Sequence, residues 1–277
     1  MNIINSGIEM TFGNMKSHEI EGTKFQCTDH VLPTVQTLLH LIEQNPQILR
    51  PVKDMDEGAR DLLVTEGFRL YPTVKNTTLI YDDNCKCFIK VLHPLTFRKY
   101  ISFLLIDRAR QIYQVADHLF SRGVKMPQIV AYGKMRIKSL PFFVMEEVQG
   151  NSLYEILLKK RKTLNMDTYS KVMEQVADLH RSGYWFGDAH LSHIFVKDDE
   201  VSGFIDIDGI RRNRFFRLKN LAKDIAGLDH PNLSLNDESR KGLLYHYLGL
   251  MDIQKRDKFN RMVKHYAERR WKGVQAR

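Results

Sequence analysis

The sequences YWFGDAHLSHIFV at residues 184–196 and GFIDIDG at residues 203–209 decide the fold of this chain. In the first stretch Asp188 precedes His193 by five residues, and Asp206 in the second stretch follows Asp188 by eighteen. A carboxylate, an imidazole and a second carboxylate at this spacing can orient a hydroxyl group and bind a divalent metal ion. The alternative interpretation is a polar surface turn without a chemical role.

The residues around these side chains predict a β-hairpin. Short apolar runs at 193–196 and 203–207 flank an acidic turn at 197–200, and apolar runs separated by turn residues are typical of paired strands. A loop followed by a hairpin would bring the three polar side chains close together. We therefore expect the chemistry of the chain to be concentrated in this segment.

Over the whole chain, the sequence pattern is rich in predicted strands before Gly150 and rich in predicted helices after it. Short runs of β-branched and aromatic residues predict strands at 68–73, 77–81, 87–92, 129–132 and 142–148. Apolar residues three and four positions apart predict helices at 31–46, 97–122, 153–160, 166–180, 243–251 and 259–271. Residues 1–30 show little periodicity and predict a loose arm.

Strands first and helices afterwards predict an α+β chain with two lobes. The 277 residues are enough for two modest lobes. We expect an N-terminal extension with a helix at 1–60. A lobe at 61–150 would hold an antiparallel sheet with one long helix, and a lobe at 151–277 would be mainly helical.

The composition is basic and favours polyanionic partners. The chain has 42 Lys and Arg against 33 Asp and Glu, a net charge of +9, which suits nucleic acid, an anionic membrane or a phosphate-bearing substrate. No nucleic-acid-reading motif is present, so we expect no nucleic acid partner. Residues 254–277 carry nine Lys or Arg and two acids, interleaved with Phe259, Tyr266 and Trp271. This pattern predicts contact with an anionic membrane surface, and its alternative is a solvated helix face.

Several other classes of protein are disfavoured. The sequence contains no Walker A, GxGxxG, HExxH or GxSxG motif. The three cysteines, Cys27, Cys85 and Cys87, form neither a disulfide framework nor a four-ligand zinc pattern, and we expect reduced thiols. The first 22 residues are polar, so we expect no signal peptide. The longest apolar run, residues 101–106, is too short to span a bilayer.

A lysine interrupts the apolar strand FIKVL at residues 88–92. Lysines rarely lie in a buried strand unless they are paired, so Lys90 indicates a binding role. The alternative is an edge-strand lysine that protects against aggregation.

Taken together, these stretches resemble the protein-kinase-like superfamily, and within it the bacterial lipopolysaccharide kinases of the Kdo/WaaP family. The resemblance extends from about Glu66 to Asp229. It is carried by FIKVL (88–92), FVMEEVQG (143–150), DAHLSH (188–193), FIDID (204–208) and RLKNLAKDIAGL (217–228). No A-P-E motif follows, which favours a small-molecule or glycan substrate over a protein.

The resemblance implies a role for each matched polar residue. Asp188 would orient the attacking hydroxyl group, because it stands where these kinases carry the catalytic-loop aspartate. Lys90 would bind the phosphates of ATP. His193 and Asp206 would hold Mg²⁺ over the β- and γ-phosphates.

The stretch at 143–150 would be the hinge that joins the two lobes and binds adenine through its backbone. We expect Glu146 and Val148 to contact the cofactor there. No glycine-rich loop exists between Phe68 and Tyr81, so Lys75 would have to cover the phosphates.

Three departures from the protein-kinase pattern accompany the resemblance. Phe186 replaces the first histidine of H-R-D, and His193 replaces the usual asparagine. Because Mg²⁺ prefers oxygen ligands, a histidine here leaves Mn²⁺ as an alternative metal. The acid that pairs with Lys90 stays open, with Asp107 as the best candidate and Gln111 nearby.

The resemblance implies an ATP-dependent kinase that phosphorylates a sugar, Kdo or heptose, of the lipopolysaccharide inner core. Its partners would be the core glycolipid and the anionic surface of the bacterial inner membrane, with the protein peripheral on the cytoplasmic side. One alternative is another small-molecule phosphotransferase, related to aminoglycoside or choline kinases. The other is a nucleotide-binding pseudokinase with a regulatory role.

Overall fold

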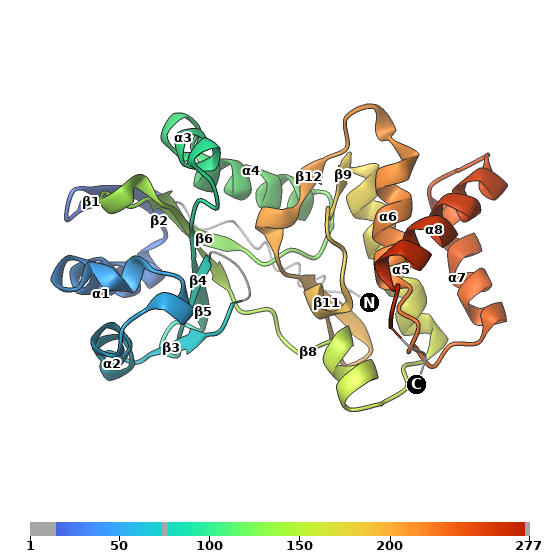
Figure 1. Cartoon of the computed structure of the whole chain (residues 1–277), viewed down its shortest axis with the longest axis horizontal. Coiled ribbons are helices and arrows are strands. Elements are labelled where there is room, and N and C mark those ends of the chain that lie inside the picture. The colour runs from blue at the N-terminus through green and yellow to red at the C-terminus, as the bar shows by residue number, and fades with distance from the viewer. Residues whose placement is uncertain (1–14, 74–76, 275–277) are drawn as a thin grey trace, which may run out of the picture. The chain divides into compact units, whose positions relative to one another are not determined.

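The computed structural model describes residues 15–73 and 77–274 (Figure 1). The chain forms two compact units. Described residues up to Gln111 and from Ile129 to Glu146 belong to the first, and residues 112–128 and those from Glu147 onward belong to the second. Lys75, which the sequence analysis places near the phosphates of ATP, lies outside the described residues.

The first unit is built on a seven-stranded antiparallel sheet with the order β1-β2-β6-β7-β5-β4-β3. Its strands are β1 (Lys16–Ile20), β2 (Thr23–Cys27), β3 (Phe68–Tyr71), β4 (Thr77–Asp82), β5 (Cys87–Leu92), β6 (Ile129–Lys134) and β7 (Pro141–Glu146). In β5, Ile89 and Val91 point into the core, whereas Phe88 and Lys90 lie on the opposite face, because side chains alternate along a strand.

Two helices, α1 (Leu32–Gln44) and α2 (Glu57–Thr65), lie beside this sheet (Figure 1). Apolar residues of α1 spaced by three and four positions, such as Val35 and Leu38, share one buried core with Ile89 and Val91 of the sheet. Short 3₁₀ turns η1 (Asp29–Val31), η2 (Pro46–Leu49) and η3 (Val52–Asp54) lead into α1 and connect it to α2, and η4 (Ile137–Ser139) joins β6 to β7. The helices thus cover the face opposite to Lys90.

Several elements differ from the sequence-based expectations, among them the N-terminal arm and the helix expected at 97–122. The expected loose arm contains β1 and β2, which form a hairpin that pairs with β6, a partner more than 100 residues away that local periodicity does not reveal. The single helix expected at 97–122 is divided into α3 (Phe97–Leu105) and α4 (Arg108–Ser121). The break falls at Asp107, whose carboxylate accepts a hydrogen bond from the backbone nitrogen of Arg110 and starts the second helix.

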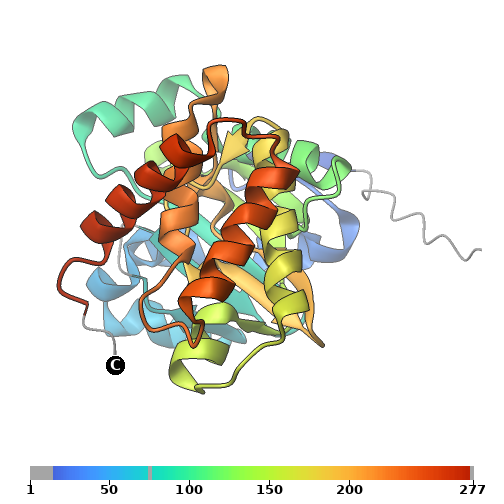
Figure 2. The same ribbon diagram turned by 90° about the vertical axis from the view of Figure 1, so that its right-hand side faces the viewer.

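The second unit is mainly helical, with α5 (Met166–Arg181), α6 (Leu218–Leu228), α7 (Asp237–Leu250) and α8 (Arg256–Arg270). Helix α7 packs against α5 and α8 packs against α6 (Figure 2). Its short elements are β8 (Asn151–Ser152), the π-helical turn η5 (Glu155–Lys159), β9 (Tyr184–Trp185), η6 (Leu191–His193), β10 (Ile194–Lys197), β11 (Glu200–Phe204), η7 (Ile207–Gly209), β12 (Arg211–Arg212) and η8 (Arg214–Phe216). The strands form a three-stranded sheet, β11-β10-β8, and a β12-β9 pair.

The predicted α+β class, with an antiparallel N-terminal sheet and a mainly helical C-terminal part, is confirmed. Cys85 and Cys87 are joined in a disulfide at the β4–β5 turn, unlike the reduced thiols expected, while Cys27 is a buried free thiol. Among the described residues, no helix combines the length and apolar character needed to cross a bilayer.

Candidate active site

The segment with Asp188 is a loop held at both ends by paired strands. Strand β9 pairs with β12, and the turn η6 leads directly into β10. Strand β10 in turn pairs with β11 in the hairpin predicted from the sequence. We refer to residues 186–193 as the catalytic loop.

A buried carboxylate fixes the start of this loop. Asp224, on α6 and 1% exposed, accepts a hydrogen bond of 2.7 Å from the backbone nitrogen of Phe186. The same oxygen lies 3.0 Å from Nε2 of the fully buried His180. Because a buried carboxylate is stable only when it is hydrogen-bonded, these contacts both satisfy Asp224 and hold the loop. Asp224 thus anchors the catalytic loop from α6.

The anchor continues into the helical core through Tyr247 on α7. Its hydroxyl group lies 2.7 Å from Nδ1 of His180. Burial, with the nearby Asp224 carboxylate, raises the pKa of Tyr247 well above its usual value, so the hydroxyl keeps its proton. The Tyr247 hydroxyl, the His180 ring and the Asp224 carboxylate thus form one hydrogen-bonded chain from α7 to the start of the loop.

Helix α6 also lies directly against the catalytic loop at Gly227. A Cβ atom at this position would lie 2.4 Å from the backbone oxygen of Ala189, a distance that real Cβ atoms do not adopt. Only glycine therefore permits this approach of helix and loop.

The anchored loop presents Asp188 to solvent. Its side chain is 60% exposed, and its Oδ1 lies 2.9 Å from Nη2 of Arg270, near the end of α8. The sequence analysis did not single out Arg270, which appeared only as one member of a basic cluster. An exposed carboxylate on a rigid loop can accept a proton from an approaching hydroxyl group.

His190 has a structural role in the same loop. Its Nδ1 accepts a hydrogen bond from the backbone nitrogen of Ser192 and lies 2.7 Å from the Ser192 hydroxyl. Burial, with smaller contributions from His193 and Arg270, lowers the pKa of His190 below its usual value. These contacts make His190 part of the internal structure of the loop.

The two predicted metal ligands lie at the open end of the hairpin. His193 comes immediately before β10, and Asp206 comes shortly after β11. The backbone nitrogen of Ile205 donates to the backbone oxygen of His193 at 2.9 Å, which ties His193 to the residue immediately before Asp206. Asp206 adopts a left-handed conformation, with φ of 66°, which is uncommon for a residue other than glycine. Strained backbone of this kind often occurs at functional sites.

The side chain of Asp206 lies over Gly209. A Cβ atom at Gly209 would lie 2.9 Å from Oδ2 of Asp206, so a larger residue there would displace the carboxylate. Within residues 15–73 and 77–274, no three His, Cys, Asp or Glu side chains gather as a metal cluster. His193 and Asp206 therefore fit a metal ion only if a ligand such as a phosphate supplies further oxygen atoms.

The predicted cofactor residues are divided between the two units. Lys90, half-buried on β5, lies between Leu79 of β4 and Phe143 of β7 in the sheet register. Glu146 ends β7 opposite Cys87. Val148 belongs to the second unit, where its side chain lies against Gly203 of β11.

We expect the Asp224→Ala substitution to lower the free energy of unfolding by about 3 kcal/mol. It would leave the buried Phe186 and His180 donors unsatisfied, at about 1–3 kcal/mol each. Urea denaturation measures this loss. The exposed Asp257, replaced by alanine on α8, serves as the control and should change stability by less than about 0.5 kcal/mol. Equal losses in the two variants would contradict the anchor.

Comparison with known families identifies the chain. The model of the lipopolysaccharide kinase (Kdo/WaaP) family matches residues 95–247, more than half of the sequence. The chain belongs to this family. The matched segment contains the catalytic loop, the hairpin and Asp224, whereas Lys90 and Arg270 lie outside it. No curated protein matches the chain at a significant level.

Three solved structures similar to this family member share 12–14% sequence identity with it. One crystal structure of WbdD has a TM-score of 0.49 and 12% identity, covering 75% of this chain and 47% of WbdD. Another, of WbdD with the kinase inhibitor LY294002, has a TM-score of 0.48 and 13% identity, covering 71% and 44%. An aminoglycoside-3'-phosphotransferase of type VIII has a TM-score of 0.48 and 14% identity, covering 72% and 94%. The chain thus spans less than half of WbdD, and neighbours at this similarity say nothing about its activity.

Proposed function

We propose that this chain is an ATP-dependent kinase that phosphorylates a sugar hydroxyl group, of Kdo or heptose, in the lipopolysaccharide inner core. The observation that carries the proposal is the buried Asp224, which holds the catalytic loop so that Asp188 is exposed. Phosphoryl transfer depends on positioning, and such an anchor supplies it. Membership in the lipopolysaccharide kinase family supports a sugar as the acceptor.

Each residue has a defined task in this proposal. Asp188 orients the acceptor hydroxyl group and accepts its proton, and Lys90 binds the phosphates of ATP. His193 and Asp206 would hold Mg²⁺, with Mn²⁺ as the alternative, and a metal ion held there would supply positive charge at the phosphates. Glu146 and Val148 would contact the adenine end of ATP, and Lys75, outside the described residues, is kept as the residue that would cover the phosphates.

Mass spectrometry of lipopolysaccharide tests the acceptor. Cells that lack the gene should lose one phosphate from the inner core, and the Asp188→Asn variant should fail to restore it. Purified protein that turns over ATP with an amine-bearing acceptor, and with no core sugar, would favour the aminoglycoside or choline kinase alternative. Protein that binds ATP without turnover would favour a pseudokinase.

We expect the His193→Asn substitution to preserve activity and to shift metal preference towards Mg²⁺. An amide oxygen is a harder ligand than an imidazole nitrogen, and Mg²⁺ prefers hard oxygen ligands. Turnover measured over a range of Mg²⁺ and Mn²⁺ concentrations checks this shift. If His193→Ala has no effect with either metal, His193 is not a ligand.

We also propose that the protein is peripheral at the cytoplasmic face of the inner membrane, with its membrane contact at η8. Phe215 is 87% exposed and Phe216 is also exposed. Four arginines surround this pair in the sequence: Arg211, Arg212, Arg214 and Arg217. Exposed aromatic residues flanked by cations are typical of segments that bind anionic interfaces.

The C-terminal segment 254–277 is less suited to this role than its sequence indicated. Phe259 is fully buried, and the indole Nε1 of Trp271 donates to the backbone oxygen of Ala226 at 3.0 Å. Two of the three interleaved aromatic residues therefore pack within the unit. Truncation after Ile253 would remove α8 from α6 and would not test membrane binding alone.

A double substitution, Phe215→Ser with Phe216→Ser, should reduce binding to anionic vesicles. Binding should also weaken steeply as salt rises, because each arginine contributes on the order of 1 kcal/mol and charge attraction decays over about 8 Å at physiological ionic strength. Vesicle co-sedimentation at two salt concentrations measures both effects. Val64→Ser, at an exposed position of α2, is the control. Absence of binding at low salt would exclude the membrane contact.

A further inference from the structure

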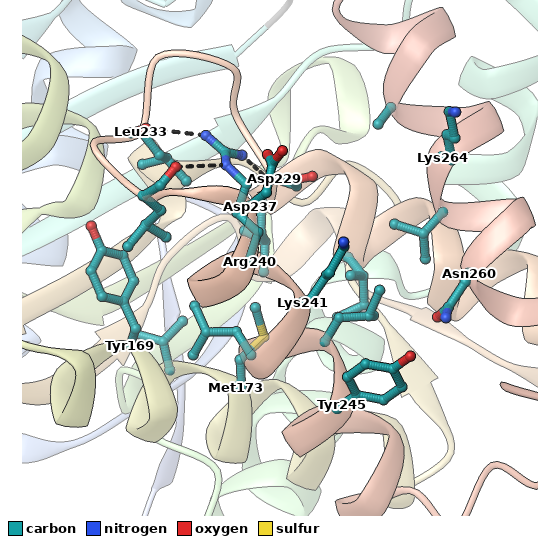
Figure 3. A pocket seen from close by; sticks show the side chains of 18 of the residues that line it. Tyr169, Met173, Asp229, Leu233, Asp237, Arg240, Lys241, Tyr245, Asn260 and Lys264 are labelled. Atoms are coloured by element: carbon teal, nitrogen blue, oxygen red, sulfur yellow. Dashed lines mark hydrogen bonds and ion pairs between the residues drawn. The ribbon is translucent and has the colours of Figure 1, made fainter. Parts of the chain in front are cut away.

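A cavity of about 580 Å³ lies within the second unit, and its lining comes largely from α5, α6, α7 and α8 (Figure 3). This volume is typical of pockets that bind small molecules. Most of the lining is aliphatic and includes Leu153, Val172, Leu191, Ile225, Leu228 and Val263. The exposed charged side chains of Asp237, Lys241, Lys264 and Glu268 lie at its mouth.

One end of the cavity is closed by a rigid polar wall. Arg240 pairs with Asp229 and donates hydrogen bonds to the backbone oxygens of Leu233 and Leu235, both at 3.1 Å (Figure 3). A guanidinium with these partners is already satisfied, so it shapes the cavity and does not need a ligand.

The cavity reaches the catalytic loop. Leu191 belongs to that loop and is 3% exposed, and it lines the cavity together with Ile225, the residue after the anchor Asp224. A molecule that fills the cavity would therefore pack on both the loop and the helix that anchors it.

Polar groups at the cavity indicate which end of a ligand is charged. Lys241 lines the mouth and supplies a positive charge there (Figure 3). Oδ1 of Asn260 is buried with no hydrogen-bond partner among the described residues, but it is an acceptor and does not pair with an anionic group. Lys264 lies one turn beyond Asn260 on the same face of α8. Two acids also lie at the mouth. Asp237 is in the first turn of α7, where the helix dipole offsets its negative charge. Glu268 follows Lys264 by four residues on α8, a spacing at which the two charges offset each other and leave Lys241 as the unbalanced charge.

We propose that this cavity binds the aliphatic chain of a single-chain anionic amphiphile, such as a fatty acid. The carboxylate stays at the mouth beside Lys241, and the chain packs on Leu191 and stabilises the catalytic loop. An aliphatic lining favours an aliphatic chain because burial of apolar surface drives such binding. The proposal goes beyond the proposed kinase function, since binding requires no turnover.

Calorimetric titration of the full chain with monomeric dodecanoate tests the binding. We expect saturation at one molecule per chain and a negative heat capacity change, the mark of apolar burial. Affinity should fall on the order of tenfold from dodecanoate to decanoate, because each buried methylene contributes about fourfold. Absence of saturable binding, or equal affinity for the two acids, would overturn the proposal.

A matched pair of substitutions on α5 locates the site. Met173 lines the cavity and is half-buried, so Met173→Trp should fill the space and weaken dodecanoate binding at least tenfold. Met166→Trp, at an exposed position of the same helix outside the lining, should leave affinity unchanged. Circular dichroism shows whether both variants fold. Equal affinity in the two folded variants would place the ligand elsewhere and overturn the proposal.

A second pair tests the charged end. Lys241→Gln should weaken dodecanoate binding by about twofold to fivefold and leave dodecanol binding unchanged, because only the acid forms an ion pair with the lysine. Lys258→Gln, outside the lining on α8, should change neither. If Lys241→Gln affects acid and alcohol equally, the proposed head-group position is wrong.

Hydrogen exchange tests the effect on the catalytic loop. Dodecanoate should slow exchange of the backbone amides in residues 186–193 of the wild-type protein and not in Met173→Trp. Unchanged exchange in a saturated wild-type protein would overturn the link through Leu191. The outcomes separate the two functions: an active kinase that binds no dodecanoate refutes this proposal alone, and an inactive chain that binds it refutes only the kinase.

Discussion

The Asp188→Asn substitution should lower turnover by roughly 10²–10⁴-fold while leaving ATP affinity nearly unchanged. An amide has nearly the shape of a carboxylate but does not accept the proton of the acceptor hydroxyl group, and general base catalysis contributes about this factor. The 60% exposure of Asp188 means that the loss of its ion pair with Arg270 costs little stability. Steady-state kinetics with ATP and a core sugar measure the turnover, and nucleotide titration measures the affinity.

Asp198→Asn is the matched control for this substitution. Asp198 lies in the β10–β11 turn of the same unit with φ of 50°, a conformation that asparagine adopts readily. The control should therefore fold and turn over like the wild type. Full activity in Asp188→Asn would remove Asp188 from the proposed mechanism.

The Lys90→Ala substitution should reduce kcat/KM for ATP by about 10²–10³-fold, the magnitude measured when one charge-stabilising group is removed from an active site. Lys90 lies on the central strand β5, which is hydrogen-bonded to β4 on one side and to β7 on the other. This pairing fixes the position of its backbone. Stability should change little, because the half-buried side chain lies on the face opposite to the core cluster. Kinetics at varied ATP concentration measure the effect.

Lys24→Ala provides the comparison for Lys90. Lys24 lies on β2 of the same sheet, and its side chain is largely exposed. This variant should keep the wild-type kcat/KM. Unchanged kinetics in Lys90→Ala would show that the lysine belongs to an ordinary strand.

Much of the candidate site was predictable from sequence because its signals are local. The hairpin after the catalytic loop forms as predicted, since alternating apolar runs and turn residues specify paired strands over a few positions. Strand β5 begins and ends at the predicted residues, with Lys90 on the non-core face. The family resemblance also rested on local signals, because each of the five strings that carry it is a short continuous stretch of sequence.

Contacts between distant segments could not be predicted in the same way. Arg270 reaches Asp188 from the last helix, across 82 positions of the chain, and Tyr247 of α7 reaches His180 across 67. The pairing of β2 with β6 and the division of α3 from α4 also departed from the expectations. A basic residue such as Arg270 has the same local pattern whether it faces water or a carboxylate.

The sequence by itself determined the identity and order of the polar groups, the two-lobed α+β class and the strand that carries Lys90. Only the tertiary structure decided which groups are anchored, which are exposed and where an apolar cavity remains. Local periodicity indicates which secondary structure a short segment favours. The anchor at Asp224 and the cavity beside Leu191 arise instead from packing of helices that are far apart in the chain.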